Sequence, residues 1–514
     1  MARRAEIKGS QRREPDDVTF ISESDPEEWI SVTVRLKSPP QGHESAQASG
    51  SFGGAAPARV SVSPEEDTST KFAPAVQIFE DLAYKLGLLI RPQPARGTIQ
   101  LEGTIAGLSN LFNTTLNYYH DGFAGFHAYS GPLRVQPDLL PWVRSVSGLD
   151  QRPLVKRRAV SLAGTGDGPA MWPIDIARLY DIPDLDAKGQ RVAVIALEGG
   201  YDLHDLNTAQ TNTHRPLINR LQVIDQSVGG VQNSFQSGQS VAERELALDL
   251  QVLTQIVPSV TIIVYFTKNS ITGLEDALQA VLDSDPDMKP HVVSISWGFP
   301  EANLSKDDRD ALQSLLGKGE ISWVAASGDD LADGGNVFFP ASSDAVISCG
   351  GTQISLSPDG KTIQQQTVWS NGVSRGSGGG ISRFVPVPDY QTKLTLPTST
   401  LSGNPGRGLP DVAAAAAGYQ IVIKGQPAPI SGTSAAAPLW AALIAMANAQ
   451  RDASPIGQQF LASLYSTPQL YCDDRITGSN VADAFGYYAN GRGWNACTGW
   501  GTPLPGIVDA LKRI

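Results

Sequence analysis

Hydrophobic and polar residues change their spacing near residue 165, so the pattern predicts two folding units. Before this point, short alternating stretches such as WISVTVRL, Thr98 to Ile105, FHAYSG and PLRVQP predict strands. Helical spacing in APAVQIFEDLAYKLGLLI and LSNLFNTTLNYY predicts two helices among them. We therefore expect residues 1–165 to contain a compact α+β domain and a linker.

Beyond residue 165 the apolar runs become nearly continuous. RVAVIALEGG, INRLQVID, TIIVYFT, HVVSISWG and EISWVAASGDD read as buried strands with helices between several of them. Such a pattern predicts an α/β domain over 166–514, with a mainly parallel central sheet flanked by helices. Functional sites of these folds lie beyond the carboxyl ends of the strands, where Glu198, Trp297 and Asp329 are found.

The stretch between the two parts, RPLVKRRAVSLAGTGDGPA, is basic and then rich in small residues. It has no periodic apolar pattern, which is typical of a linker open to proteolysis. A second stretch, from Gln41 to about Thr70, is rich in Gly, Ala, Ser and Pro and is expected to be a mobile loop.

Charge and cysteine content narrow the function classes. The 514 residues carry a net charge of -12, which argues against a surface that binds nucleic acid. No segment is long enough to span a bilayer, and the basic N-terminus lacks the apolar run of a conventional signal peptide. Three cysteines cannot build a disulfide framework, although a bridge between Cys472 and Cys497 stays open.

Ser434 is a candidate nucleophile. It follows Gly432 and Thr433 and opens the apolar helix AAAPLWAALIAMANA. At a helix N-terminus, free N–H groups and the helix dipole stabilise developing negative charge. Taken alone, however, the local sequence favours a simple N-cap serine.

Glu245 and Asp249 are candidate acid/base residues. They stand four apart in AERELALDLQVLTQIV, on a helical row that continues to Val252 and Ile256. Acidic pairs at this spacing are more often a surface feature, but a row shared with aliphatic residues predicts an inward pair. Burial and mutual repulsion would raise at least one of the two pKa values. The polar side of the helix is expected to consist of Glu243, Arg244, Gln251 and Gln255.

Asp329 lies in the glycine-containing turn VAASGDD at a strand end, where an ordinary Asx turn is the alternative and Asp330 competes with it. None of the histidines stands in the His-Gly context of a subtilisin-type triad, which disfavours a Ser-His-Asp mechanism. The six histidines are His43, His120, His127, His204, His214 and His291.

These motifs together resemble the sedolisin family of serine-carboxyl peptidases, and among them the kumamolisin-like members. SGTSAAAP is similar to the family's nucleophile motif, ERELALD to its Glu-x-x-x-Asp helix and SGD to its aspartate turn. The resemblance implies a subtilisin-like catalytic domain. It also implies that Ser434 is the nucleophile and Glu245 its general base. Asp249 would be the partner of that base, and Asp329 the oxyanion-hole donor. LEGGY and SISWG look like segments that would add Glu198 and Trp297 to the proton network.

The run DDRITGSN, continuing to NGRGWNACTGWGTP, resembles the family's calcium loop. The ligands implied for one structural Ca²⁺ are Asp474, the carbonyls of Arg475, Gly491 and Gly493, and Asn495. Family members commonly have aspartate at the position of Asn495, so this site would hold one fewer negative charge and bind Ca²⁺ more weakly. A turn-rich surface loop is the alternative.

The N-terminal part resembles the family's propeptide, through LEGTIAGLSNLFNTTLNYY and VSGLDQRP. This implies that residues 1–165 assist folding and block the active site until they are cleaved off. An accessory binding domain is the alternative. The expected partners are protein or peptide substrates and the chain's own propeptide, with no nucleic acid and no membrane, and the chain is expected to be a monomer.

The expected function is that of an acid-active serine-carboxyl peptidase made as a zymogen. Asp329 could stabilise an oxyanion only when protonated, and free carboxyls have pKa values of about 4, so activity should be confined to acidic pH. A serine-type endopeptidase is expected and tripeptidyl-peptidase activity stays open, because the sequence does not distinguish internal cleavage from release of N-terminal tripeptides. An extracellular location is expected. The alternative from a different class of function is a catalytically inactive relative that serves as a binding or inhibitory module.

Overall fold

The computed structural model describes residues 4–15, 18–37, 64–93, 97–121, 125–153, 170–219, 222–238, 240–318 and 320–514. The chain divides into two compact units, one made of Met1–Pro153 with Ser270–Thr272 and Ser305–Arg309, the other of the remainder. Most of the loop predicted from residue 41 onward, and the linker around residue 165, lie outside the described residues. Among the described residues, no helix is both long and apolar enough to cross a bilayer.

The N-terminal unit is built on a four-stranded antiparallel sheet of order β4-β5-β3-β9. The first residues of β3 alternate between exposed and buried and its last three are all buried, and Val32 and Val34 pack in one core with Phe79 of α1 and Leu108 of α2. The α+β pattern predicted for this part is therefore present. Its strands are β1 Ala5–Glu6, β2 Thr19–Glu23, β3 Trp29–Leu36, β4 Leu89–Gln93, β5 Thr98–Thr104, β6 Asn117–His120, β7 Gly125–Ala128, β8 Arg134–Val135 and β9 Val143–Ser147, and its helices are α1 Pro64–Leu86 and α2 Ile105–Phe112.

The second helix of this unit is shorter than the sequence predicted. It ends at Phe112, because Asn113 adopts a left-handed conformation with φ of 49° and its N–H bonds back to Ser109. Asparagine tolerates this conformation better than most residues and commonly ends helices. The remainder of the predicted helix leaves the helical conformation, and residues 117–120 form strand β6 instead.

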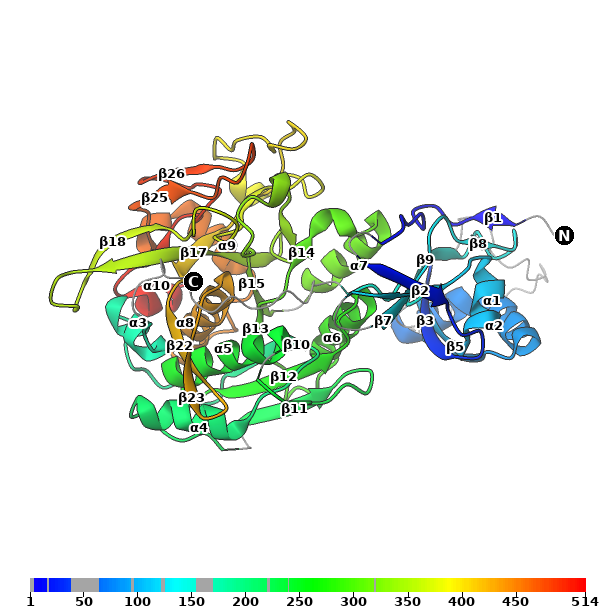
Figure 1. The fold of residues 1–514 in the computed structure, drawn as a ribbon, viewed down its shortest axis with the longest axis horizontal. Helices are drawn as coiled ribbons and strands as arrows, with labels where there is room; N and C mark the ends of the chain where they lie inside the picture. The colour runs from blue at the N-terminus through cyan, green and yellow to red at the C-terminus, as the bar shows by residue number, and fades with distance from the viewer. Residues whose placement is uncertain are drawn as a thin grey trace, which may run out of the picture. The chain divides into compact units, whose positions relative to one another are not determined.

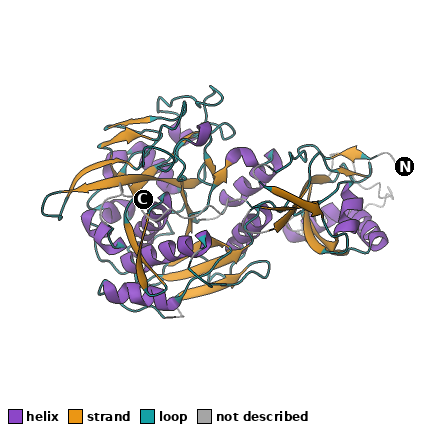
Figure 2. Ribbon diagram, in the orientation of Figure 1, coloured by secondary structure: helices purple, strands orange, loops and turns teal. Residues whose placement is uncertain are grey.

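The larger unit contains a ten-stranded sheet of order β11-β12-β10-β13-β15-β17-β18-β25-β26, with β21 also paired to β17. Pairing is parallel from β11 to β17 and antiparallel between β17 and β18. Figure 1 shows these strands succeeding one another across the unit, and Figure 2 shows the helices packed around them. The mainly parallel sheet predicted from the sequence is thus present. Its strands are β10 Arg191–Leu197, β11 Val223–Ser227, β12 Thr261–Thr267, β13 Val292–Ile295, β15 Ser322–Ala326, β17 Val346–Leu356, β18 Ile363–Val368, β21 Val412–Ala415, β25 Ile476–Ser479 and β26 Tyr488–Asn490.

Shorter strand pairs and helices complete the chain. The pairs are β14 Phe299–Pro300 with β16 Phe338–Phe339, β19 Gly380–Ile381 with β20 Gly408–Leu409, β22 Tyr419–Ile423 with β23 Gln426–Ile430, and β24 Cys472–Asp473 with β27 Thr502–Pro503. The helices after residue 170 are α3 Pro173–Leu179, α4 Leu203–Asn212, α5 Val241–Ile256, α6 Ile271–Leu282, α7 Lys306–Leu316, α8 Ala436–Ala449, α9 Gln459–Ser466 and α10 Ile507–Leu511.

Two helices, α5 and α8, set the position of the residues singled out in the sequence. They pack against each other, and α8 also contacts β13, β15 and β17. Every residue of α8 from Ala436 to Asn448 is buried, which explains why this helix has no polar face. Trp440 anchors it through a hydrogen bond of 2.9 Å from Nε1 to the Ala413 carbonyl. The start of α8 is therefore fixed by the core.

The polar side expected for α5 is wrong. Gln251 and Gln255 are fully buried, and Glu243 is 3% exposed. The Gln251 carboxamide pairs with the backbone of Val422 in β22, donating to its carbonyl (2.8 Å) and accepting from its N–H (2.7 Å). A carboxamide has both a donor and an acceptor, so it satisfies a strand edge as another strand would. The amphipathic pattern did not reveal this because the helix is covered on several sides.

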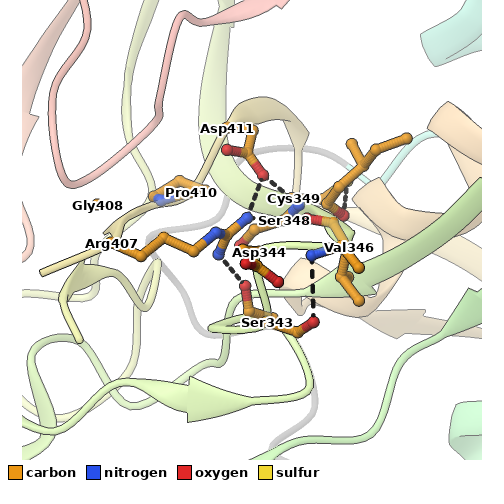
Figure 3. A network of polar contacts seen from close by, with 12 residues as sticks. Ser343, Asp344, Val346, Ser348, Cys349, Arg407, Gly408, Pro410 and Asp411 are labelled. Carbon is orange, nitrogen blue, oxygen red and sulfur yellow. Dashed lines mark hydrogen bonds and ion pairs between the residues drawn. The ribbon is translucent and has the colours of Figure 1, made fainter. Parts of the chain in front are cut away.

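A buried ion pair joins the segments around the central strand β17 (Figure 3). Arg407 and Asp411 have no exposed side-chain surface and lie 2.7 Å apart, Nη2 to Oδ2. Arg407 also donates to the Val346 carbonyl (2.8 Å), and Asp411 accepts from the Ser348 N–H (2.7 Å) and the Tyr465 hydroxyl (2.7 Å). A buried pair is stable only when further hydrogen bonds satisfy both partners, as they do here.

All three cysteines are buried free thiols. The bridge that the sequence left open between Cys472 and Cys497 is therefore not formed. Burial raises the pKa of both of these thiols, with the carboxylates of Asp473 and Asp474 adding to the effect at Cys472. Thiols of this kind are unreactive, and we assign them a packing role.

Candidate active site

Ser434 lies in a single 3-10 turn, Thr433–Ala435, immediately before α8. Ala435 occupies the N-cap of α8 and no side chain caps it, so Ser434 is not the capping residue that its local sequence suggested. Its side chain is 5% exposed. A Cβ at Gly432 would lie 2.8 Å from Asp329 Oδ2 and 3.6 Å from Ser434 Oγ, so glycine keeps this space open.

Glu245 and Asp249 face the Ser434 turn from α5. The Ser434 hydroxyl is near enough to Glu245 to lower the pKa of that carboxyl. Asp249 is 1% exposed, and its Oδ1 lies 2.6 Å from the hydroxyl of Ser296, which in turn lies 3.3 Å from the Ser434 carbonyl. The inward orientation predicted for the acidic pair is therefore correct, and Ser296 links that pair to the backbone of Ser434.

The two carboxyls of α5 are held in a state that favours protonation. Burial raises the pKa of Glu245 well above its usual range, and the nearby charge of Asp249 raises it further, whereas the Ser434 hydroxyl acts in the opposite direction. Burial also raises the pKa of Asp249, against the effect of the Ser296 hydrogen bond. Two carboxyls that interact this strongly titrate as a pair rather than independently. A raised pKa makes the ionised form of either carboxyl a stronger proton acceptor than an ordinary carboxylate.

Asp329 approaches Ser434 from the carboxyl end of β15. Its Oδ1 accepts two hydrogen bonds from Thr433, from the backbone N–H (2.7 Å) and the hydroxyl (2.8 Å). Its Oδ2 lies 3.1 Å from Nη2 of Arg375. Burial raises the pKa of Asp329, while Arg375 and the Thr433 bonds lower it. Asp329, rather than its neighbour Asp330, is thus tied to the residue next to Ser434.

Glu198 directly follows β10, and Trp297 lies two residues beyond the end of β13, the neighbouring strand of the same sheet. Trp297 is 7% exposed, and Glu198 has a left-handed backbone with φ of 68°. The residue after it, Gly199, lies so close to the first turn of α5 that a Cβ there would be 2.7 Å from the Ala242 side chain. Both residues therefore lie at the predicted edge of the sheet, and their part in proton transfer stays a prediction.

The histidines with described side-chain contacts are engaged with other residues. His127 lies 2.8 Å from the Ser24 hydroxyl and 3.0 Å from Glu28 in the N-terminal unit. His291 lies at the other end of β13, where its Nε2 is 3.2 Å from Arg191. These two imidazoles therefore have partners other than Ser434.

Residues 228–467 match the model of the Subtilase family. Kumamolisin from Bacillus sp. (strain MN-32) is 35% identical over 446 residues, covering 81% of this chain and 79% of that protein. Sedolisin from Pseudomonas sp. (strain 101) is 30% identical over 449 residues, covering 80% of this chain and 74% of that protein. The chain belongs to the sedolisin family.

Comparison with solved structures agrees with this family. Pseudomonas sedolisin, a serine-carboxyl proteinase complexed with two molecules of pseudo-iodotyrostatin, is similar with a TM-score of 0.56 and 26% identity. The match covers 68% of this chain and 98% of that chain. The larger unit therefore has the subtilase-like sedolisin fold, with its mixed sheet and surrounding helices, and the protein is a serine peptidase of the sedolisin family.

The loop that resembles the sedolisin calcium site brings part of the implied ligand set together. The N–H of Gly493 donates to Asp474 Oδ2 (2.7 Å), and both Gly491 and Gly493 have left-handed backbones. The side chain of Arg475 pairs with Asp473 at 2.6 Å, which leaves only its carbonyl for a metal. A carboxylate and backbone carbonyls are the oxygen ligands that Ca²⁺ prefers. The chemistry of these four donors suits the ion, and within the set a hydrogen bond joins Gly493 to Asp474.

The fifth implied ligand, Asn495, is engaged in a turn. Its Oδ1 accepts from the Cys497 N–H (3.0 Å), the Thr498 N–H (2.9 Å) and the Thr498 hydroxyl (3.1 Å). An amide oxygen has two lone pairs, so three donors saturate it. In this arrangement Asn495 does not fit a calcium ligand, and binding through it would require these bonds to break.

Sequence reasoning missed three residues of the site: Ser296, Arg375 and Thr433. Ser296 and Thr433 stand next to residues that were singled out, inside SISWG and SGTS. A hydroxyl adjacent to a predicted site residue at a strand or helix end was the available signal. Arg375 had no such signal, since it lies 46 positions from Asp329 along the chain.

Proposed function

We propose that this sedolisin-family peptidase is an acid-active endopeptidase, with Ser434 as nucleophile, Glu245 as general base and Asp329 as oxyanion-hole donor. The observation that carries the proposal is the carboxyl pair beside Ser434. Glu245 occupies the place that a histidine holds in a Ser-His-Asp triad, and Asp249 stands behind it. All three positions of the proposed machinery are filled, which argues against an idle binding module.

The reaction would proceed through an acyl-enzyme. As the Ser434 hydroxyl attacks the peptide carbonyl, Glu245 takes its proton, and a C–O bond forms to give a tetrahedral intermediate. Glu245 then returns the proton to the amine as the C–N bond breaks. Water repeats these steps on the ester and releases the acid, with Glu245 again receiving and returning the proton. Asp249 would share the proton load, with Glu198 and Trp297 beyond it.

The oxyanion would accept a hydrogen bond from Asp329 only if that side chain is protonated, because an ionised carboxylate has no donor. Thr433 already occupies Oδ1 with two donors, so the proton belongs on Oδ2. This oxygen borders the space that Gly432 keeps open next to Ser434. The geometry therefore supports a proton on Oδ2, the oxygen of Asp329 that faces the space beside Ser434.

We expect kcat/KM to be bell-shaped in pH with its maximum in the acidic range. Glu245 must lose a proton to act as base, which sets the acidic limb, and Asp329 must keep one, which sets the alkaline limb. Because burial raises the pKa of Asp329, the donor form persists above the ordinary range, then falls about tenfold per pH unit. Cleavage of an internally quenched peptide library between about pH 3 and pH 8 measures both limbs.

The matched variant for this experiment is Asp329→Asn. An amide keeps an N–H donor at all pH values, so the variant should have a lower maximal rate and a much flatter alkaline limb. Mass analysis of the products also separates internal cleavage from release of N-terminal tripeptides. A wild-type profile with its maximum above pH 7 would refute the carboxyl mechanism.

The N-terminal unit is proposed to be an inhibitory propeptide that is removed at acidic pH by cleavage in the segment 154–169. The basic and small residues of that segment support this proposal. The N-terminal unit also has a compact hydrophobic core of its own. We further propose that the processed enzyme works outside the cell as a monomer.

Calcium is proposed as a structural ion held by Asp474 and the carbonyls of Arg475, Gly491 and Gly493, with weak affinity because Asn495 is engaged elsewhere. Replacing Asn495 with aspartate should strengthen binding, since one carboxylate oxygen can keep the turn while the other, with its charge, faces the ion. We expect saturating calcium to stabilise Asn495→Asp by about 1–3 kcal/mol more than the parent chain.

Thermal unfolding in calcium and in EGTA checks this expectation, in a Ser434→Ala background that prevents self-digestion. The matched control is Asn490→Asp, which adds the same charge at an exposed position on the neighbouring strand β26. Equal calcium effects in the two variants would show that Asn495 is not at the metal site.

A further inference from the structure

Arg375 lies beside the proposed catalytic residues although no motif pointed to it. Its guanidinium Nη2 is 3.1 Å from Asp329 Oδ2, and the two side chains are 26% and 25% exposed. An arginine stays charged at every pH at which a peptidase works. A permanent cation therefore contacts the carboxyl that the mechanism requires in its neutral form.

The loop that carries Arg375 is ordered without help from this side chain. Asn371 folds the turn, and its N–H donates to the Arg375 carbonyl (2.8 Å). The N–H of Gly376 then donates to the Asp329 carbonyl (2.9 Å), which fixes the loop backbone to the strand end. The Asn371 Oδ1 accepts from the backbone N–H groups of Val373, Ser374 and Arg375. The guanidinium is thus available to interact with the Asp329 carboxyl.

Arg375 and the catalytic proton compete for the same oxygen. The Thr433 N–H donates to Asp329 Oδ1 and its hydroxyl lies 2.8 Å from the same oxygen, so a proton on Oδ1 would have to displace or reorient these donors. Oδ2 is left, and Oδ2 is the atom that Arg375 contacts. Protonation of Oδ2 removes the charge that binds the guanidinium, so the cation favours the ionised form.

We propose that Arg375 is a positioning residue that holds Asp329 as a carboxylate and thereby sets the pH at which Asp329 becomes a donor. This inference rests on the proposed function, because it concerns the donor named there. The other charged groups around Asp329 are Asp330, next along the chain, and Glu245 of α5. Both are acidic and favour the protonated form, so Arg375 opposes them.

The size of the effect follows from the geometry. An opposite charge in direct contact lowers the pKa of a carboxyl by about 1–3 units, and partial exposure places this pair at the lower end. Removing the charge should therefore move the alkaline limb of kcat/KM upward by about one pH unit. Arg375 lowers the pKa of Glu245 by a smaller amount, so its removal should move the acidic limb of kcat/KM upward by less.

The experiment compares kcat/KM against pH for the wild type, Arg375→Gln, Arg375→Lys and the control Arg178→Gln. Arg178 is an exposed arginine on α3 that is paired with Asp175 at 2.8 Å. We expect the alkaline limb to rise in Arg375→Gln, to return toward the wild-type position in Arg375→Lys, and to stay in place in the control. An unmoved limb in Arg375→Gln, or an equal shift in Arg178→Gln, would overturn the inference. If Arg375→Gln does not fold, Arg375→Met takes its place under the same criteria.

A second readout separates this inference from the proposed function. In the inactive Ser434→Ala chain, infrared difference spectroscopy follows the C=O band of the protonated carboxyl, assigned by its loss in Asp329→Asn. The titration of that band should move upward by about one pH unit when Arg375 becomes glutamine. A shifted band together with a wild-type chain that cleaves no peptide at any pH would support the pairing and refute the peptidase mechanism. An active wild-type enzyme with an unshifted band would refute the role of Arg375 and leave the proposed function standing.

Discussion

Replacement of Ser434 by alanine is expected to lower kcat by about 10⁴-fold or more, because the acyl-enzyme cannot form without its hydroxyl. Alanine fits the site without strain, since the residue is already surrounded by the alanines of the helix start. Peptide cleavage at the acidic optimum measures the loss. Acidification of the purified full-length chain adds a second readout, since the wild type should cut within 154–169 and the variant should stay intact.

The control for this experiment is Ser402→Ala, which removes a hydroxyl from an exposed loop and should leave both readouts unchanged. Residual turnover in Ser434→Ala above about one hundredth of the wild-type rate would point to a different nucleophile. Unchanged thermal unfolding in both variants is needed to attribute the loss to chemistry rather than to folding.

The second large effect is expected on stability, at the buried pair of Arg407 and Asp411. Arg407→Met would leave Asp411 without its counter-ion in a site with no exposed surface, and breaking such a pair costs about 3–5 kcal/mol. Burial already raises the pKa of Asp411 against the effect of Arg407, so loss of the cation raises it further. A folded-state pKa above the unfolded value means that the penalty is small below about pH 4 and grows as pH rises.

Denaturant unfolding of Arg407→Met in the Ser434→Ala background, at pH 4 and pH 7, measures both the loss and its pH dependence. The double variant Arg407→Met with Asp411→Asn removes the charge and should recover part of the loss at pH 7. The matched control is Arg178→Met, an exposed ion pair for which we expect a change of about 0–1 kcal/mol. A loss at Arg407 no larger than this control would show that the pair is dispensable.

Much of the fold followed from the sequence because buried parallel strands leave a strong signal. The runs ending at Glu198, Trp297 and Asp329 were apolar throughout, and the strands they predicted lie side by side in one sheet. The spacing of Glu245 and Asp249 likewise fixed their common face. Local periodicity decides such features, so they can be predicted before any tertiary contact is known.

The remaining features depend on contacts between distant segments. Whether Gln251 faces water or a strand edge depends on β22, which lies 171 positions away along the chain. Asn495 was identified as a substitution at a metal site, but the three donors that occupy its oxygen come from its own turn. Neither arrangement changes the hydrophobic pattern of the sequence, so neither could be predicted from that pattern.

The burial of α8 has a consequence for how the enzyme would lose activity on heating. The candidate nucleophile lies in the 3-10 turn immediately before α8, a helix with no exposed face, and its proposed base lies on α5, which packs against α8. Sliding or loosening of this helix pair would disturb the core and the reacting atoms at the same time. Inactivation on heating should therefore coincide with cooperative unfolding of the larger unit, leaving no range of temperature in which a folded enzyme has a disordered site.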